Sequence, residues 1–182
     1  MELFQSIDIY FFKIINISFA NPFFDWLMPI ITNQHNWNPI YLFLILFLIV
    51  KYKKKGVIIV LLLIIAVGLT DLISSHIIKE IFQRLRPCWT QTEIHLLVPC
   101  GAGKSFPSSH AANNFALAYI LSYFFKQNKW IFYILATLVA YSRVAVGVHY
   151  PSDVIGGALL GLFISYSIIH FFNKYFAKKI NN

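Results

Sequence analysis

The sequence predicts an all-α protein: an integral-membrane helical bundle of five to six transmembrane helices, preceded by an N-terminal interfacial amphipathic helix. Of the 182 residues, 58% are hydrophobic and only 12% are charged, which is too apolar for a soluble domain of this length. Long apolar runs recur along the chain, and in lipid each run must form a helix to satisfy its backbone groups. We therefore expect a single membrane-embedded domain over 1–182, with interfacial helices in 1–36 and the transmembrane bundle in 37–182.

The first segment is predicted to be a helix that lies in the membrane interface. Apolar side chains recur at helical spacing over residues 3–15, while Asp8 and Lys13 interrupt them, a pattern typical of an interfacial amphipathic helix. Residues 23–31 follow an Asn-Pro break and mix apolar side chains with an acid, a tryptophan and a proline. This mixture suits the headgroup layer, and the alternative is that 23–31 is a sixth span.

Five apolar runs are predicted to cross the membrane. They cover about 37–52, 57–78, 109–125, 130–147 and 153–172. Lysines gather at alternate ends of these runs, which predicts that those ends face the cytoplasm. These lysines are Lys51, Lys53, Lys54, Lys55, Lys126, Lys129, Lys174, Lys178 and Lys179. The net charge of +8 therefore reflects topology and contact with anionic lipid headgroups, and it does not indicate nucleic-acid binding.

Three short motifs fall at the opposite ends of the runs, and the first is a pair of cations. Lys79 and Arg86 are separated by about two helical turns, so both lie on one face at the end of a span. Pro87 disfavours helical geometry at Arg86, so the helix should end there and direct both cations into the loop. Taken alone, the pair is equally consistent with cations that reach for lipid headgroups.

The second motif is Pro107-Ser108-Ser109-His110, directly before the third long run. Serine is a favoured N-cap, and a helix N-terminus with hydroxyl groups binds anions. His110, in the first helical turn, would stand beside such an anion and exchange a proton with it. The alternative is that Ser108 only caps the helix while His110 lies in the interface.

The third motif joins Ser142-Arg143 to His149 and Asp153, which flank a turn containing Pro151. Proline suits the first position of a helix, and this places the carboxylate within reach of the imidazole. An aspartate bonded to one ring nitrogen leaves the other nitrogen with a free lone pair for attack. Arg143 can bind phosphate oxygens through its planar guanidinium. The alternative, a capping Asp153 beside an interfacial histidine, leaves the ordered set of motifs unexplained.

In motif order, residues 79–153 resemble the type 2 phosphatidic acid phosphatase family, of the superfamily shared with vanadium haloperoxidases and bacterial acid phosphatases. The family pattern is Lys, six residues, Arg-Pro; then Pro-Ser-Gly-His; then Ser-Arg, five residues, His, three residues, Asp. This chain departs from it once, because Ser109 stands at the usual glycine. The chain thus carries the full set of family side chains with one small substitution.

The resemblance implies a role for each motif residue. His149 would be the nucleophile, Asp153 would orient it, and His110 would protonate the leaving alkoxide and then activate the water that hydrolyses the phosphohistidine. Phosphate binding is implied for Lys79, Arg86, Ser108, Ser109 and Arg143. We expect no metal and no other cofactor, because three fixed cations can neutralise the phosphoryl charge as a metal does elsewhere.

We therefore expect a metal-independent phosphatase that acts on a lipid phosphate in the bacterial inner membrane, with its site on the periplasmic face. Among envelope lipids the prediction leans to the 1-phosphate of lipid A. Undecaprenyl diphosphate and phosphatidylglycerol phosphate are the alternatives, and a lipid-phosphate transporter that binds without cleaving is the alternative of another class. Arg84 and Lys104, beside the motifs, are candidate contacts for a second phosphate or a sugar.

The two cysteines, Cys88 and Cys100, both lie in the loop that this topology places outside the cytoplasm. Disulfides persist in oxidising compartments such as the periplasm. We expect a Cys88–Cys100 bridge that pins the loop, and two free thiols are the alternative.

Overall fold

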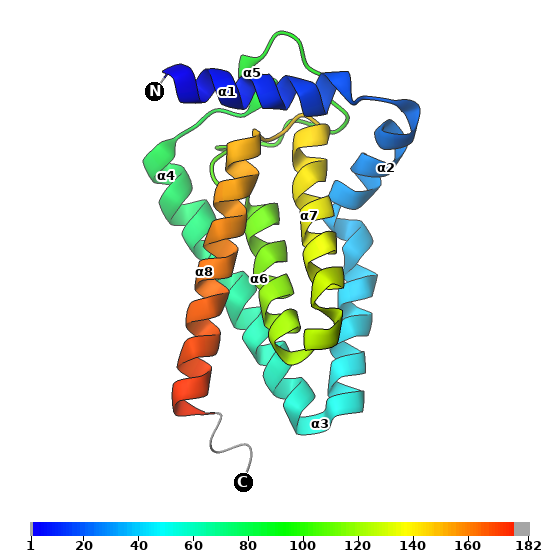
Figure 1. The fold of residues 1–182 in the computed structure, drawn as a ribbon, viewed down its shortest axis with the longest axis vertical. Helices are drawn as coiled ribbons and strands as arrows, with labels where there is room; N and C mark the ends of the chain where they lie inside the picture. Colours follow the sequence, from blue (N-terminus) through cyan, green and yellow to red (C-terminus); the bar gives the residue numbers. More distant parts are fainter. Residues whose placement is uncertain (1, 177–182) are drawn as a thin grey trace.

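The structure, a computed structural model, describes residues 2–176, with Glu2 described by its backbone only. Every regular element in this part of the chain is a helix, which confirms the all-α prediction. The elements, labelled in Figure 1, are α1 (Glu2–Lys13), η1 (Ile14–Ser18), α2 (Pro22–Thr32), α3 (Gln34–Leu72), η2 (Ile73–Ile78), α4 (Lys79–Phe82), α5 (Pro87–Thr90), α6 (Ser109–Phe124), η3 (Lys126–Asn128), α7 (Lys129–Ala145) and α8 (Pro151–Tyr175).

Helix α3 is a hairpin rather than one rod. Its 39 residues include Lys53, whose backbone is not helical (φ 49°, ψ −124°), and the chain reverses there (Figure 1). The two arms correspond to the predicted runs at 37–52 and 57–78, and the second arm continues through η2 into α4. The other three predicted runs coincide with α6, α7 and α8.

The number of membrane crossings remains a prediction. Two described segments are long and apolar enough to cross, Gln34–Thr90 and Pro151–Tyr175, and the bent pair Leu3–Ser18 and Pro22–Thr32 makes a third if it is one span. Gln34–Thr90 has 57 residues and contains the α3 hairpin, so it holds more than one crossing length of about 20 residues. Helices α6 and α7, with 16 and 17 residues, are shorter than this typical length.

Helix α6 lies inside the bundle and packs against α3, α7 and α8 (Figure 1). Its closest approach is to α8 at Gly157 and Gly161, where a Cβ atom would clash with the carbonyl oxygens of Ser108 and Ala112. These glycines are four residues apart and share one face of α8, so the two backbones can touch. The close contact holds the N-termini of α6 and α8 together at one end of the bundle.

Helix α1 lies across this same end (Figure 1). Its inward face buries Asp8 and Phe12, which are 5% and 0% exposed. Its outward face is apolar and exposes Leu3, Phe4, Ile7, Tyr10 and Phe11. An exposed apolar face is what a helix in the membrane interface requires. Asp8, the acid that interrupts the apolar pattern, therefore lies on the inward face of the helix.

The lysine-rich segments gather at the opposite end, at the α3 hairpin, at η3 and near the end of α8 (Figure 1). Lys178 and Lys179 lie outside the described residues. The bundle thus has a lysine-rich end and an end that carries the three motifs and α1, as the alternation of lysines along the sequence predicts.

Candidate active site

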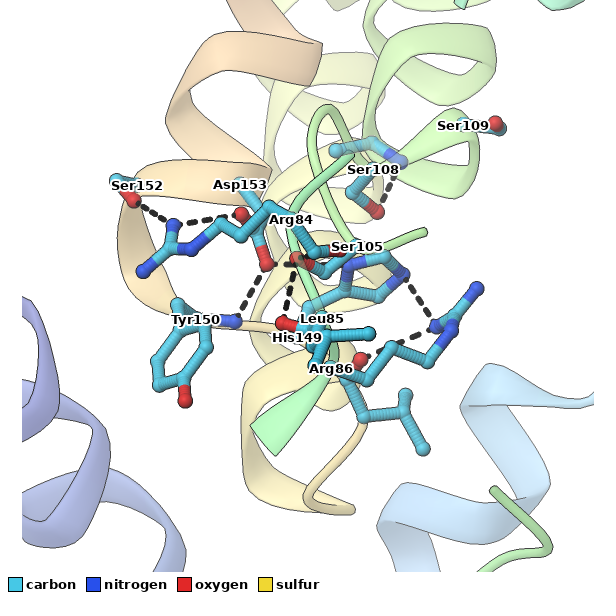
Figure 2. Close-up of polar contacts among 12 residues, drawn as sticks. Arg84, Leu85, Arg86, Ser105, Ser108, Ser109, His149, Tyr150, Ser152 and Asp153 are labelled. Atoms are coloured by element: carbon cyan, nitrogen blue, oxygen red, sulfur yellow. Dashed lines mark hydrogen bonds and ion pairs between the residues drawn. The ribbon is translucent and has the colours of Figure 1, made fainter. Parts of the chain in front are cut away.

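His149 lies at the centre of the motif end, in the connection between α7 and α8, and is 2% exposed. Arg86 Nη1 is 3.1 Å from His149 Nε2 and also donates to the Val148 carbonyl at 3.1 Å (Figure 2). A guanidinium group only donates hydrogen bonds, so Nε2 accepts this one. The imidazole is therefore held as the tautomer that carries its proton on Nδ1 and a lone pair on Nε2.

Asp153 faces the other ring nitrogen. Its Oδ2 is 3.4 Å from His149 Nδ1 and accepts the Tyr150 backbone N–H at 2.8 Å, while Oδ1 accepts Arg84 Nη1 at 2.8 Å (Figure 2). The carboxylate is fully buried in the first turn of α8. It therefore caps the helix and lies against the imidazole, where His149 Nδ1 is in close contact with the carboxylate but forms no hydrogen bond with it.

The surroundings of His149 favour its neutral form. Burial lowers the pKa of His149 well below the ordinary 6.5, and the positive charges of Arg143, Arg86 and Lys79 lower it further. A neutral imidazole keeps the lone pair that nucleophilic attack requires.

Arg143, in the last turn of α7, is held by α2. Its Nη1 donates to Thr32 Oγ1 at 2.5 Å. The Nε atoms of Arg143 and Arg86 are both buried and find no acceptor among residues 2–176. An unpaired buried donor costs about 1–3 kcal/mol, and an anion bound between the two guanidinium groups would supply the missing acceptors.

Lys79 and Ser109 are in direct contact. Lys79 Nζ donates to Ser109 Oγ at 2.9 Å, and the same hydroxyl lies 3.1 Å from Ser74 Oγ and 3.2 Å from Ser75 Oγ. Both of these serines lie in η2, the π-helical turn directly before Lys79. The serine that departs from the family pattern therefore anchors the first cation of the site.

Ser108 and His110 occupy the N-terminus of α6. Ser108 Oγ caps the helix by accepting Ala111 N at 3.4 Å, and its backbone N–H donates to the Asp153 carbonyl at 2.9 Å. The His110 ring lies within electrostatic range of Arg143, His149, Lys79 and Arg86. The structure thus brings the eight candidate site residues to one end of the bundle.

A cavity of about 670 Å³ opens beside these residues. His110 and Ser109 line it, and so do apolar side chains of α3, α6 and α7, among them Leu44, Val60, Leu63, Leu117 and Val139. The cavity therefore joins the polar end to the apolar interior between the helices.

Arg84, a candidate contact for a second phosphate, is instead bound to two carboxylates of the protein. Its Nη2 donates to Asp8 Oδ2 at 2.6 Å and its Nη1 to Asp153 Oδ1 at 2.8 Å, and its guanidinium stacks 4.1 Å from the centre of the Tyr150 ring. Both ends of the guanidinium are thus occupied by carboxylates. Asp8 and Thr32 support the site through Arg84 and Arg143, and the sequence alone does not reveal either contact.

The loop before α6 is fixed close to the site. Cys88 and Cys100 are joined by a disulfide with Cα atoms 6.0 Å apart. Ser105 is fully buried, and its hydroxyl donates to the Leu85 carbonyl at 3.1 Å. Within residues 2–176, no group of three His, Cys, Asp or Glu side chains is placed to hold a metal ion.

Residues 56–177 match the PAP2 superfamily. The lipid A 4′-phosphatase of Bacteroides thetaiotaomicron is 33% identical over 82% of this chain and 72% of its own. The crystal structure of Aquifex aeolicus LpxE has a TM-score of 0.74 at 27% identity, covering 90% of this chain and 95% of that one. The crystal structure of the first transmembrane PAP2-type phosphatidylglycerolphosphate phosphatase from Bacillus subtilis has a TM-score of 0.72 at 27% identity, covering 97% and 90%. The chain therefore belongs to the PAP2 superfamily and is a metal-independent lipid phosphatase of the membrane.

Proposed function

We propose that this phosphatase removes a phosphate from an envelope lipid through a phosphohistidine on His149. The observation that carries the proposal is the pair of buried guanidinium groups, Arg86 and Arg143, whose Nε atoms find no acceptor among residues 2–176. One of these groups touches the unprotonated nitrogen of a buried imidazole. A phosphate bound there would supply the missing acceptors and would lie beside a nucleophile.

The proposed reaction begins when phosphate oxygens accept hydrogen bonds from Arg86, Arg143 and Lys79. Arg86 Nη1 turns from His149 Nε2 to a phosphate oxygen, and Nε2 attacks phosphorus while the phosphorus–oxygen bond to the lipid breaks. Asp153 stabilises the positive charge that develops on the ring. His110, which takes up a proton together with the anionic phosphate, gives it to the departing oxygen. It then takes a proton from the water that attacks the phosphohistidine and releases inorganic phosphate.

The cavity supports a lipid substrate. Its polar end holds His110 and Ser109, and its walls between the helices are mainly apolar. A lipid phosphate could therefore reach the cations while its hydrocarbon stays among the helices or in the bilayer. We propose that α3 contributes two crossings and α6, α7 and α8 one each, with α1 in the interface.

The lipid that we favour is lipid A. From the sequence we expect its 1-phosphate, whereas the Bacteroides relative is named for the 4′-phosphate, and the assay below compares the two positions. Phosphatidylglycerol phosphate is the second candidate, because the Bacillus phosphatase of that name shares the fold over 97% of this chain.

We also propose that the site faces the periplasm. The support is the lysine-rich opposite end, which the positive-inside rule places in the cytoplasm, and the Cys88–Cys100 disulfide at the motif end. Single cysteines introduced at Lys54 and at Lys104 of a Cys88→Ser, Cys100→Ser chain would test it. A membrane-impermeant thiol reagent should label position 104 in intact spheroplasts and position 54 only after lysis, and the reverse pattern would invert the topology.

Phosphate release by the purified protein in detergent tests the function. Lipid A carrying only the 1-phosphate, lipid A carrying only the 4′-phosphate, phosphatidylglycerol phosphate and undecaprenyl diphosphate would be assayed side by side. We expect release that persists with a chelator, is inhibited by vanadate and is absent from a folded His149→Ala variant. Vanadate binding without release from any of these lipids would instead support a transporter.

A further inference from the structure

We infer that Asp8, on the interfacial helix α1, is a positioning residue for the nucleophile and acts through Arg84. The inference rests on the proposed role of His149 and adds a part of the chain that none of the three motifs contains. Its basis is a continuous series of contacts from Asp8 through Arg84 and Asp153 to the imidazole.

Asp8 is held on both of its oxygens. Oδ2 accepts Arg84 Nη2 at 2.6 Å and the Ser152 hydroxyl at 2.5 Å, and Oδ1 accepts the Ser152 backbone N–H at 2.9 Å. Ser152 is the residue directly before Asp153 in the first turn of α8. One side chain of α1 therefore fixes both the guanidinium that binds Asp153 and the backbone that carries it.

Arg84 continues the series. Its Nη1 donates to Ser152 Oγ at 2.6 Å and to Asp153 Oδ1 at 2.8 Å, and Asp153 Oδ2 lies 3.4 Å from His149 Nδ1 (Figure 2). The charges alternate from acid to guanidinium to acid, and the developing imidazolium would be the next cation. Without Asp8, the full charge of Arg84 would act on Asp153, which would then stabilise the imidazolium less well.

Attachment of α1 to the bundle does not depend on a buried acid. Phe12 is fully buried and its ring packs edge-on against Tyr150 at 5.5 Å, and Asn16 Nδ2 donates to the Ala145 carbonyl at 2.8 Å. Lys13 Nζ pairs with Glu93 Oε2 at 3.0 Å on the exposed side. Burial of a carboxylate costs free energy unless the carboxylate is paired. The buried Asp8 is therefore better explained by a role in the active site than by a role in attaching α1 to the bundle.

The test compares Asp8→Asn with Lys13→Gln, a control that breaks the exposed ion pair of the same helix. We expect Asp8→Asn to lower kcat at least tenfold while KM and the vanadate inhibition constant stay within twofold, because Asp8 does not reach the phosphate. Lys13→Gln should keep all three constants within twofold. Should Asp8→Asn fail to fold, Arg84→Lys, which keeps the charge but cannot bridge two carboxylates, should show the same loss of kcat alone.

A double variant separates positioning from a general loss of structure. Combining Asp8→Asn with Arg84→Lys should lower kcat little further than either change alone, since both interrupt one series of contacts. Wild-type kcat in Asp8→Asn, or equal losses of kcat and vanadate affinity, would overturn the inference. A His149→Ala protein that still turns over would refute the proposed function itself, whatever Asp8→Asn does.

Discussion

Thr32 offers the sharpest test of how the phosphate site is held. It is 5% exposed at the end of α2, and its Oγ1 accepts Arg143 Nη1 at 2.5 Å. Thr32→Val keeps the shape of the side chain and removes only the acceptor, so Arg143 would bury a second unpaired N–H beside its Nε. Hydrogen bonds to charged groups contribute about 1.5–3 kcal/mol. A change of about 1.36 kcal/mol alters a rate tenfold. If the whole of this hydrogen-bond energy serves to place Arg143, its loss in Thr32→Val lowers kcat/KM by roughly 10- to 150-fold.

The assay is phosphate release in detergent, with the vanadate inhibition constant measured in parallel. Thr32→Ser keeps the hydroxyl and is the matched control, which should stay within about threefold of wild type because the hydrogen bond is retained. Thr32→Val should weaken vanadate inhibition as well as turnover, since Arg143 is proposed to bind the anion directly. A folded Thr32→Val protein with wild-type kcat/KM and wild-type vanadate inhibition would refute the reasoning.

Three further predictions concern protonation, packing and the departure from the family pattern. Because the pKa of His149 lies below 6.5, its ring should remain neutral as the pH falls through 6, with the proton on Nδ1. ¹⁵N NMR, with the His149 signals assigned by comparison with His149→Asn, would measure this. An imidazolium at pH 6 would contradict it. Gly161→Ala should lower the thermal midpoint of unfolding in detergent, because the added Cβ meets the Ala112 carbonyl and overpacking costs about 1–3 kcal/mol. Gly68→Ala, which has open space around it, is the control and should not lower the midpoint. Equal midpoints for the two variants would exclude the close contact. Ser109→Ala removes the hydroxyl that holds Lys79 and should raise KM by about tenfold or less, and an unchanged KM would argue that Lys79 is placed by other contacts.

The sequence predicted the helices well because lipid imposes a strong rule on them. A run that crosses or enters the membrane must be apolar and helical, so the runs near 109–125 and 153–172 coincide with α6 and α8. The grouping of the motifs was predictable for a similar reason. His149 and Asp153 flank a proline that begins a helix, so local geometry alone brings them within 3.4 Å.

The supporting contacts could not be predicted because they join distant parts of the chain. Asp8 meets Ser152 across 144 positions, and Thr32 meets Arg143 across 111. The residue pattern of α1 shows an acid among apolar residues, but it does not show which face of the helix packs against the bundle. The carboxylate partners of Arg84 were missed for the same reason, since Asp8 and Asp153 lie 76 and 69 positions away from it in the sequence.

The most direct test of His149 as the nucleophile is to trap the phosphorylated enzyme. The protein would be mixed with a ³²P-labelled lipid phosphate, quenched in alkali within milliseconds and digested for mass spectrometry, with His149→Ala and His110→Ala treated alongside. We predict an acid-labile phosphoryl group on the peptide that contains His149 and none in His149→Ala. In His110→Ala the group should both form and decay more slowly, because His110 is proposed to act in both steps. A phosphoryl group on another residue, or turnover by His149→Ala, would contradict the assignment of His149 as the attacking group.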